Sequence, residues 1–215
     1  MDIDKQMKIG IIGSGNIGGN IGKHWAKAGH EVMFSSRHPE ELQSMADEVG
    51  AKTGDTKSAA AFGEVILLAI PYGKTPDVAQ QIGGLDNKIL IDAGNPYPQR
   101  DGAVAQKVID DESQTATGYI ASLFPKAKTV KAFNSVHQKV FADQAFREGD
   151  ERIAVQICSD DESAKETVKQ LIKDIGFAPQ DLGNLSQGAL YEPDAPLYNQ
   201  NLKIRDAEKL LSEMK

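Results

Sequence analysis

Three glycines at fixed spacing are the first residues in this sequence whose arrangement points to chemistry. Gly13, Gly15 and Gly18 form a Gly-x-Gly-x-x-Gly pattern that follows the apolar run 8–12 and precedes a stretch of helical spacing. Between a strand and a helix, such a pattern allows a tight turn, a close approach of the main chain to a pyrophosphate, and tight packing of the helix on the strand. Amide groups at the start of the helix then point toward the phosphate. The stretch predicts a dinucleotide-binding loop; the alternative is a close-packed turn and nothing more.

A second polar group follows the next apolar run, in the stretch FSSRHPEE at residues 34–41. Enzymes that prefer NAD usually carry an acidic residue at the end of this strand, which binds the ribose hydroxyls. Ser36 and Arg37 stand there instead, and a hydroxyl and a planar guanidinium match the oxygens of a phosphate. His38 would add a further donor. Two or three charge-assisted hydrogen bonds of about 1.5–3 kcal/mol each would favour NADP over NAD by about two to four orders of magnitude. The alternative is that Arg37 is a solvated charge beside a helix.

Three later apolar runs end in small polar residues, at 67–74, 89–98 and 130–138. In an open parallel sheet the ligand lies beyond the carboxyl ends of the strands, so these ends are expected to contact a ribose and a nicotinamide. Asn95 and Asn134 are candidates for hydrogen bonds to a cofactor or substrate, with a turn role as the alternative. His137 is the one histidine expected near this site and is the candidate general acid.

The remaining titratable side chains suggest no second reactive centre. His24 and His30 flank the first expected helix and are expected at the surface, and Cys158 is expected to pack inside a strand. No metal-ligand spacing occurs in the sequence, so no metal is expected. Hydride transfer between two bound rings depends on proximity and orientation more than on acid–base groups. The small number of candidate acid–base residues agrees with such a reaction.

Apolar runs alternate with stretches of helical spacing, which predicts an α/β protein with a Rossmann-type, doubly wound and mainly parallel sheet. We expect one NADP-binding domain over residues 1–215, with a short C-terminal extension over about 182–215 that is irregular to 201 and helical over 202–214. The expected strands are 8–12, 31–35, 65–70, 88–92, 129–133 and 152–158, and the expected earlier helices are 17–28, 39–49 and 161–175.

Composition narrows the range of partners. The 215 residues include 24 Lys and Arg and 31 Asp and Glu, for a net charge of −7, which disfavours binding to nucleic acid or to an anionic membrane. A single cysteine excludes an internal disulfide and suggests a reducing compartment, so a cytoplasmic location is expected. The first eight residues resemble no signal peptide, and the longest apolar run, 65–71, is too short to cross a bilayer.

The segments GSGNIG, FSSRHPEE, LAIPY, DAGNPY, VKAFNSV and QDLGNL together resemble the family of NADP-dependent oxidoreductases typified by the archaeal enzyme that reduces NADP with the deazaflavin coenzyme F-420. The cytoplasmic domain of the six-transmembrane metalloreductases is similar too. The resemblance extends to about residue 185, but Glu41 stands where the archaeal enzyme has lysine and Asn134 where it has histidine. It implies cofactor contacts along the whole set Gly13, Ser14, Gly15, Asn16, Ile17, Gly18, Ser35, Ser36, Arg37, Ala69, Ile70, Pro71, Tyr72, Ala93, Gly94, Asn95, Pro96, Asn134, Ser135 and Val136.

The resemblance implies an NADPH-dependent oxidoreductase that transfers a hydride between NADP(H) and a small-molecule acceptor such as F-420, FMN or FAD. One alternative is a reductase of an imine, a carbonyl or a quinone, and another is a non-catalytic protein that senses NADP(H). Open space above Ile70, Asn95 and Asn134 would favour catalysis, whereas a side chain filling that space would favour sensing. The family also implies a homodimer, for which the apolar stripe near the C-terminus is either a contact or a cover for the chain's own sheet.

Overall fold

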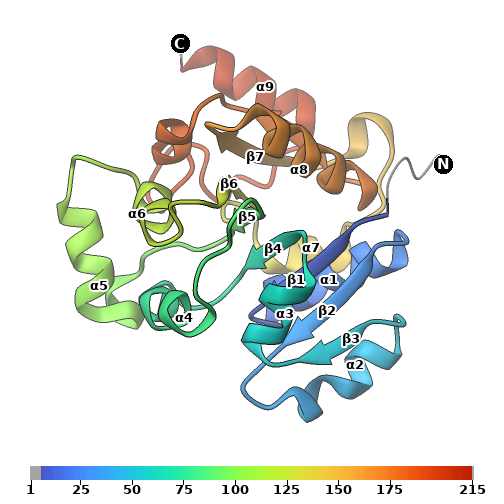
Figure 1. Ribbon diagram of the computed structural model, residues 1–215. Helices are drawn as coiled ribbons and strands as arrows, with labels where there is room; N and C mark the ends of the chain where they lie inside the picture. The colour runs from blue at the N-terminus through green and yellow to red at the C-terminus, as the bar shows by residue number, and fades with distance from the viewer. Residues whose placement is uncertain (1–5, 215) are drawn as a thin grey trace.

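A computed structural model describes residues 6–214 as one eight-stranded sheet with helices on both of its faces (Figure 1). Residues 1–5, within the segment that resembles no signal peptide, and Lys215 lie outside the described part. The strands are β1 (Lys8–Ile12), β2 (Glu31–Ser35), β3 (Lys52–Gly54), β4 (Val65–Leu68), β5 (Ile89–Asp92), β6 (Lys128–Ala132), β7 (Ala154–Ser159) and β8 (Ala178–Asp181). The α/β, Rossmann-type class predicted from the sequence is confirmed.

The helices connect successive strands. They are α1 (Asn16–Lys27), α2 (Gln43–Asp47), α3 (Thr56–Phe62), α4 (Thr75–Ile82), α5 (Pro98–Asp110), α6 (Ala116–Leu123), α7 (Gln138–Asp143), α8 (Glu162–Asp174) and α9 (Ile204–Glu213), with short 3-10 turns at η1 (Pro39–Leu42), η2 (Tyr72–Lys74), η3 (Gly149–Glu151) and η4 (Leu185–Leu190). The expected helix 39–49 is therefore a 3-10 turn followed by a short α-helix.

The strand order β3-β2-β1-β4-β5-β6-β7-β8 places the point of reversal between β1 and β4. The pairs from β3 to β6 are parallel, the β6–β7 pair is antiparallel, and β7–β8 is parallel. In open sheets of this kind the ligand crevice lies outside the carboxyl ends of the strands at the reversal point. The fold therefore brings the glycine loop after β1 beside the turns that follow β4 and β5.

Alternation along the central strands supplies a core on each face of the sheet. Ile9 and Ile11 point into one cluster, which also contains Trp25 of α1, while Ile66 and Leu68 point into a second cluster on the other face. Burial on both faces explains why these strands read as continuous apolar runs. The sequence missed β3 and β8, whose residues KTG and APQD lack an apolar run because both strands lie at an edge of the sheet.

The C-terminal segment packs on the chain's own sheet. Tyr191 and Leu197 are buried in a third cluster with Cys158 of β7, and Leu210 and Leu211 of α9 pack against it. Segment 182–201 is irregular apart from η4, as expected, and a helix follows it. Leu210 and Leu211 of the C-terminal apolar stripe therefore contribute to this core.

Two histidines correct the sequence-based expectation. His30 is buried, and its Nε2 lies 3.0 Å from Oδ2 of Asp174 on α8. His24 is half-buried, with Nε2 2.7 Å from the carbonyl oxygen of Phe141, and burial lowers its pKa. Neither lies at the surface as predicted, because α7 and α8 return to cover the end of α1, a long-range contact that local pattern does not encode.

Candidate functional site

Two adjoining cavities form a groove along the carboxyl ends of the strands. The loop cavity, of about 610 Å³, is lined by the glycine loop, by residues 35–37 after β2 and by the start of α4. The strand-end cavity, of about 550 Å³, is lined by the residues that follow β4, β5 and β6. Ile70 and Pro71 line both, so the two form one continuous groove that crosses the reversal point of the sheet.

The glycine loop has the geometry that a bound pyrophosphate requires. Gly13 has a φ of +95°, and a Cβ there would lie 2.5 Å from the carbonyl oxygen of Ala69. A Cβ on Gly18 would lie 2.1 Å from the carbonyl oxygen of Gly13, so α1 sits against the loop at a distance that only glycine permits. A Cβ on Gly15 would meet nothing within 4 Å. Because Gly15 faces open space and caps α1 without a side-chain hydrogen bond, the first amides of the helix are available to an anion.

Two predicted site serines have structural hydroxyls. Ser14 Oγ donates to the carbonyl oxygen of Ser35 and accepts from its amide, both at 3.1 Å. Ser35 Oγ donates to the carbonyl oxygen of Ile11 at 2.7 Å, and the Ser35 side chain is buried. These bonds fix the glycine loop to the tip of β2. The predicted cofactor contact of Ser35 is thus restricted to its backbone.

The far end of the loop cavity carries uncompensated positive charge. Arg37 is exposed there and makes no ion pair or side-chain hydrogen bond with residues 6–214. Ser36 Oγ accepts from the amide of His38 at 3.1 Å, which leaves its hydroxyl hydrogen free to donate. Lys74 and Thr56 also line this cavity, and sequence reasoning did not assign either of them. The lining thus includes two cations, the hydroxyl groups of Ser36 and Thr56, and one acid, Asp77.

The strand-end cavity brings together most of the other predicted residues. Its lining includes Asn16, Ile17, Ala69, Ala93, Gly94, Asn95, Asn134, Ser135, Val136 and His137. His137 caps α7, where its Nδ1 accepts from the amide of Lys139 at 3.2 Å, and its side chain is exposed.

The two asparagines bond to each other across the ends of β5 and β6. Asn95 Nδ2 donates to the carbonyl oxygen of Asn134 at 2.8 Å, and Asn134 Nδ2 donates to Asn95 Oδ1 at 3.1 Å and to the carbonyl oxygen of Tyr191 at 2.8 Å. Asn134 Oδ1 is buried and has no hydrogen-bond partner among the described residues. An unpaired acceptor is costly in a folded protein, so this oxygen is a candidate for a ligand donor.

Two predicted residues lie elsewhere than expected, whereas Gly18 packs α1 against the loop, the role that its place in the motif predicts. The Tyr72 side chain is buried in the second core cluster, where its hydroxyl donates to the carbonyl oxygen of Ala116 at 2.7 Å, so it does not line the groove. Pro96 lines a neighbouring cavity rather than the groove. Side chains after a strand alternate in direction, and sequence alone did not say which would face inward.

A buried charge network beneath the strand-end cavity was not foreseen. Lys131 and Asp92 are both fully buried, with Nζ 3.4 Å from Asp92 Oδ2 and 3.4 Å from the carbonyl oxygen of Gly94. Asp92 also accepts from the amide of Gly94 at 2.9 Å and from Thr117 Oγ1 at 2.6 Å, and Glu192 Oε1 lies 3.7 Å from Nζ. The pair therefore holds the amide and the carbonyl group of Gly94, in the turn that presents Asn95. The sequence does contain a sign of this pair, because β5 and β6 each carry one charged residue, Asp92 and Lys131, within or at the end of a buried strand.

Cys158 is fully buried, as predicted, and burial raises its pKa to about 11. Tyr191 donates to its Sγ at 2.9 Å. Such a thiol is not a nucleophile at neutral pH.

Tyr97 and Tyr198 form a second unforeseen feature, because both line the strand-end cavity and also the neighbouring cavity that contains Pro96. Their hydroxyls are hydrogen-bonded to each other. Burial, and then this bond, raise the pKa of Tyr198. Arg100 lies over the Tyr97 ring at 4.9 Å, and its Nη2 donates to the carbonyl oxygen of Asn95 at 3.0 Å.

Residues 6–214 contain no group of three or more His, Cys, Asp or Glu side chains placed to hold a metal ion. No helix in this part of the chain is both long and apolar enough to span a membrane.

Comparisons with known proteins agree with this geometry. Residues 8–96 match the family model described as NADP oxidoreductase, coenzyme F420-dependent. Metalloreductase STEAP3 of Rattus norvegicus is 32% identical over 83% of this chain, and this chain spans only 34% of that relative's length. The F420-dependent NADP reductase of Methanocaldococcus jannaschii is 27% identical over 89% of this chain and 90% of its own.

A solved structure of a hypothetical protein from Sinorhizobium meliloti covers 94% of this chain and 97% of its own at 28% identity, with a TM-score of 0.79. The matched region 8–96 contains the glycine loop, the tip of β2 and the turns after β4 and β5. Residues 8–96 therefore match the family of coenzyme F420-dependent NADP oxidoreductases, and 89% of the chain is similar to an F420-dependent NADP reductase.

Proposed function

We propose that this protein is an NADP(H)-dependent oxidoreductase that transfers a hydride between the nicotinamide and a small-molecule acceptor. The observation that carries the proposal is Arg37, which has no ion pair within residues 6–214 and lies beside Ser36 at one end of a groove whose other end is open. Relatives named as F420-dependent NADP reductases support it.

The residues of the loop cavity fit a dinucleotide 2′-phosphate. Arg37 offers a planar pair of donors, Ser36 offers a hydroxyl, and Lys74 adds a second cation to the lining of the same cavity. The pyrophosphate would lie over Gly15, where a Cβ would meet open space, and next to the first amides of α1. The chain thus holds the adenosine end by charge and the pyrophosphate by backbone.

In the strand-end cavity, residues of the chain would orient the nicotinamide. Asn134 Oδ1, buried and unpartnered, would accept from the carboxamide, and Ile70 would support one face of the ring. The Asp92–Lys131 pair fixes the Gly94 turn and so the cavity wall. Bound NADPH would supply a hydride, which is equivalent to two electrons and one proton. The reduced acceptor would take a second proton from water. Accurate placement contributes more to such a reaction than a general acid does. His137 lies close enough to the cavity to be retained as a candidate acid.

For the acceptor we propose a flavin-like or deazaflavin ring, with F-420, FMN and FAD as the named candidates from the family. A small imine, carbonyl or quinone is the second candidate. The open strand-end cavity of about 550 Å³ above Ile70, Asn95 and Asn134 favours catalysis over sensing, because no side chain fills the place of a second ring.

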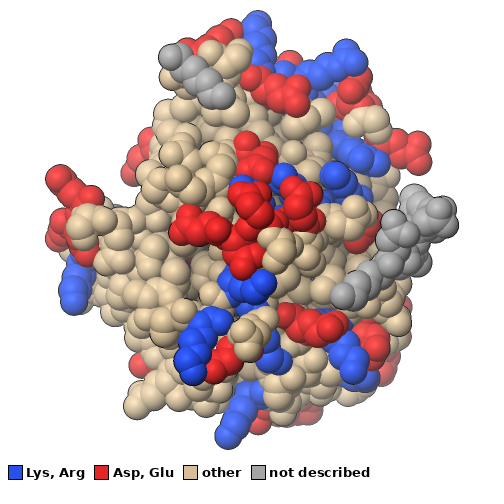
Figure 2. All heavy atoms as spheres, turned by 45° about the horizontal axis from the view of Figure 1, so that its top comes forward, with Lys and Arg blue, Asp and Glu red and all other residues tan. Residues whose placement is uncertain are grey.

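We propose a small molecule rather than nucleic acid or a membrane as partner. The net charge is −7, and on the face shown in Figure 2 acidic side chains gather near the centre among separate basic ones, without a continuous basic surface. A cytoplasmic location and a homodimer are proposed from the family. Sedimentation velocity measures the latter directly.

The test is NADPH oxidation under anaerobic conditions, followed at the nicotinamide absorbance band, with F-420, flavins and quinones offered in turn. We expect turnover with at least one ring acceptor, and much slower turnover with NADH. Tight NADPH binding without oxidation by any acceptor would instead identify a sensor.

A further inference from the structure

A third cavity adjoins the groove. This acidic cavity, of about 1,020 Å³, lies between α5, the start of α6 and η4, and it meets the strand-end cavity at Tyr97 and Tyr198. Its volume is at the upper end of the range of small-molecule sites. A compound whose reactive ring lies in the strand-end cavity would extend past the tyrosine pair into this space.

The charged side chains that line the acidic cavity all have one sign. They are Asp111, Glu112, Asp160, Glu192 and Asp194, and no Lys, Arg or His lines it within residues 6–214. Glu192 has Lys131 at 3.7 Å, whereas the other four have no ion pair in this part of the chain. Asp111 and Asp160 accept hydrogen bonds from neutral donors only, so their charges are not compensated. The cavity therefore carries a negative potential.

The one feature that would favour an anion here is already used. Helix α6 begins at the cavity wall, and its first amide, that of Ala116, donates to Glu192 Oε1 at 3.1 Å. The Thr115 side chain accepts from the amide of Gly118 at 3.1 Å. With two amides at the helix start bonded to the chain's own groups, a phosphate or carboxylate of a ligand would find five acidic side chains and no cation in the described lining.

The rest of the lining suits an uncharged ring compound. Pro96, Val108 and Leu185 supply apolar surface, and Tyr97 and Tyr198 supply two aromatic rings at the junction with the groove. Aromatic side chains bind flat rings and organic cations favourably. The apolar and aromatic lining and the negative charge of this cavity therefore both favour an uncharged or cationic ring compound.

We infer that the acidic cavity binds the part of the electron acceptor that extends beyond its reactive ring, and that the acceptor is an uncharged or cationic ring compound rather than one with phosphate or carboxylate groups. This inference rests on the proposed function, and among the proposed acceptors it disfavours F-420, FMN and FAD, each of which carries a phosphate. Glu112 and Asp194 are the specificity-determining residues, since both are exposed and neither has a hydrogen-bond partner in the described chain.

The test compares riboflavin with FMN, which share one ring and differ by a phosphate. Each is titrated against the NADP⁺-loaded protein at low salt, with binding read from quenching of flavin fluorescence. We expect FMN to bind at least about tenfold more weakly than riboflavin, and the ratio to shrink as salt is added. Equal or tighter binding of FMN would overturn the inference, and so would failure of both flavins to bind.

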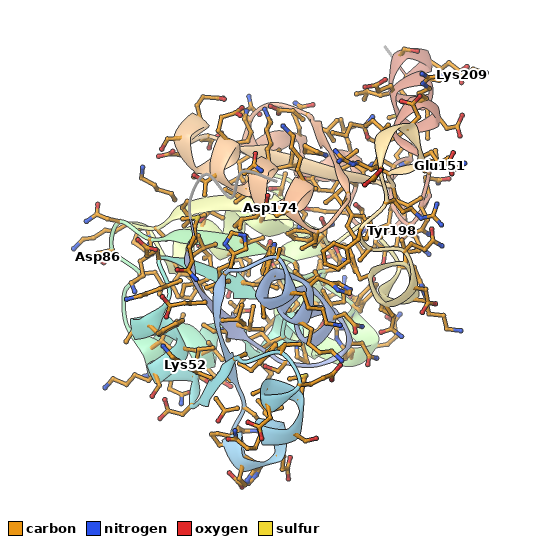
Figure 3. The ribbon with its side chains drawn as sticks, turned by 90° about the vertical axis from the view of Figure 1, so that its right-hand side faces the viewer. Lys52, Asp86, Glu151, Asp174, Tyr198 and Lys209 are labelled. Carbon is orange, nitrogen blue, oxygen red and sulfur yellow. The ribbon has the colours of Figure 1, made fainter. Side chains whose placement is uncertain are left out.

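Charge variants assign the effect to this cavity. Glu112→Gln combined with Asp194→Asn is expected to bring FMN binding close to that of riboflavin. Asp86→Asn is the matched control, because Asp86 lies in the turn before β5, outside the cavity, and on the opposite side of the molecule from Tyr198 (Figure 3). A ratio unchanged in the double variant, or changed equally in the control, would contradict the assignment.

A space-filling variant tests the location without changing charge. Ala189 is exposed on η4 and lines the cavity, so Ala189→Trp is expected to weaken riboflavin binding about tenfold or more while NADP⁺ binding is retained. Unchanged riboflavin binding would place the acceptor elsewhere. These titrations do not depend on turnover. A protein that shows the predicted preference but never oxidises NADPH would refute the proposed function and leave the inference intact.

Discussion

Replacing Arg37 by alanine is expected to weaken the binding of NADPH strongly and that of NADH hardly at all. The guanidinium lies exposed in the loop cavity with no partner in residues 6–214, so its removal breaks no internal contact of the described chain. A hydrogen bond to a charged group contributes about 1.5–3 kcal/mol, which corresponds to a rise of about 10- to 150-fold in the NADPH dissociation constant. NADH lacks the 2′-phosphate, so its constant is expected to change less than about twofold.

Isothermal titration calorimetry with both nucleotides measures the two constants. Arg205→Ala is the matched control, since Arg205 is an exposed arginine of α9 that pairs with Asp150 and lines no part of the groove. Lys74→Ala is expected to give a smaller loss of the same selectivity. Equal weakening of NADPH and NADH in Arg37→Ala would refute the assignment of Arg37 to the 2′-phosphate.

Three further predictions concern the scaffold. Lys131→Met is expected to lower the free energy of unfolding by about 3–5 kcal/mol because it leaves Asp92 charged and buried, and adding Asp92→Asn should restore part of the loss in urea denaturation. Cys158 has a pKa raised to about 11, so at pH 8 only about one thiol in a thousand is ionised; the native chain should resist an aromatic disulfide reagent that reacts at once after unfolding. Asp161, the N-cap of α8, has a pKa lowered to about 2, first by the hydrogen bond from the amide of Ala164. Its ionised form therefore contributes stability above its unfolded pKa of about 4, and this contribution is lost as the pH falls toward 2. The difference in stability between Asp161→Asn and the native chain at pH 6 should accordingly shrink as the pH falls from 4 toward 2; a constant difference would contradict this.

Local chemistry explains what the sequence could predict. Gly13, Gly15 and Gly18 act within one strand–turn–helix unit, so their spacing between an apolar run and a stretch of helical pattern indicated the loop that the structure contains. The position of Arg37 at the tip of β2 followed from the apolar run before it. Central strands were recognisable because burial on both faces leaves a continuous apolar run.

Long-range pairing explains most of what was missed. Asp92 meets Lys131 across 39 positions, and Tyr97 meets Tyr198 across 101, so no local pattern connects them. His30 was predicted at the surface and is buried because α8, far along the chain, supplies Asp174 to cover it. Edge strands such as β3 carry too few apolar residues to be recognised.

A crystal structure of the protein soaked with NADP⁺ is the most direct test of the central claim. We expect the 2′-phosphate between Ser36 and Arg37, the pyrophosphate over Gly15, and the nicotinamide in the strand-end cavity, with its carboxamide donating to Asn134 Oδ1. A nucleotide bound outside this groove, or bound in it with the 2′-phosphate turned away from Arg37 into solvent, would contradict the account.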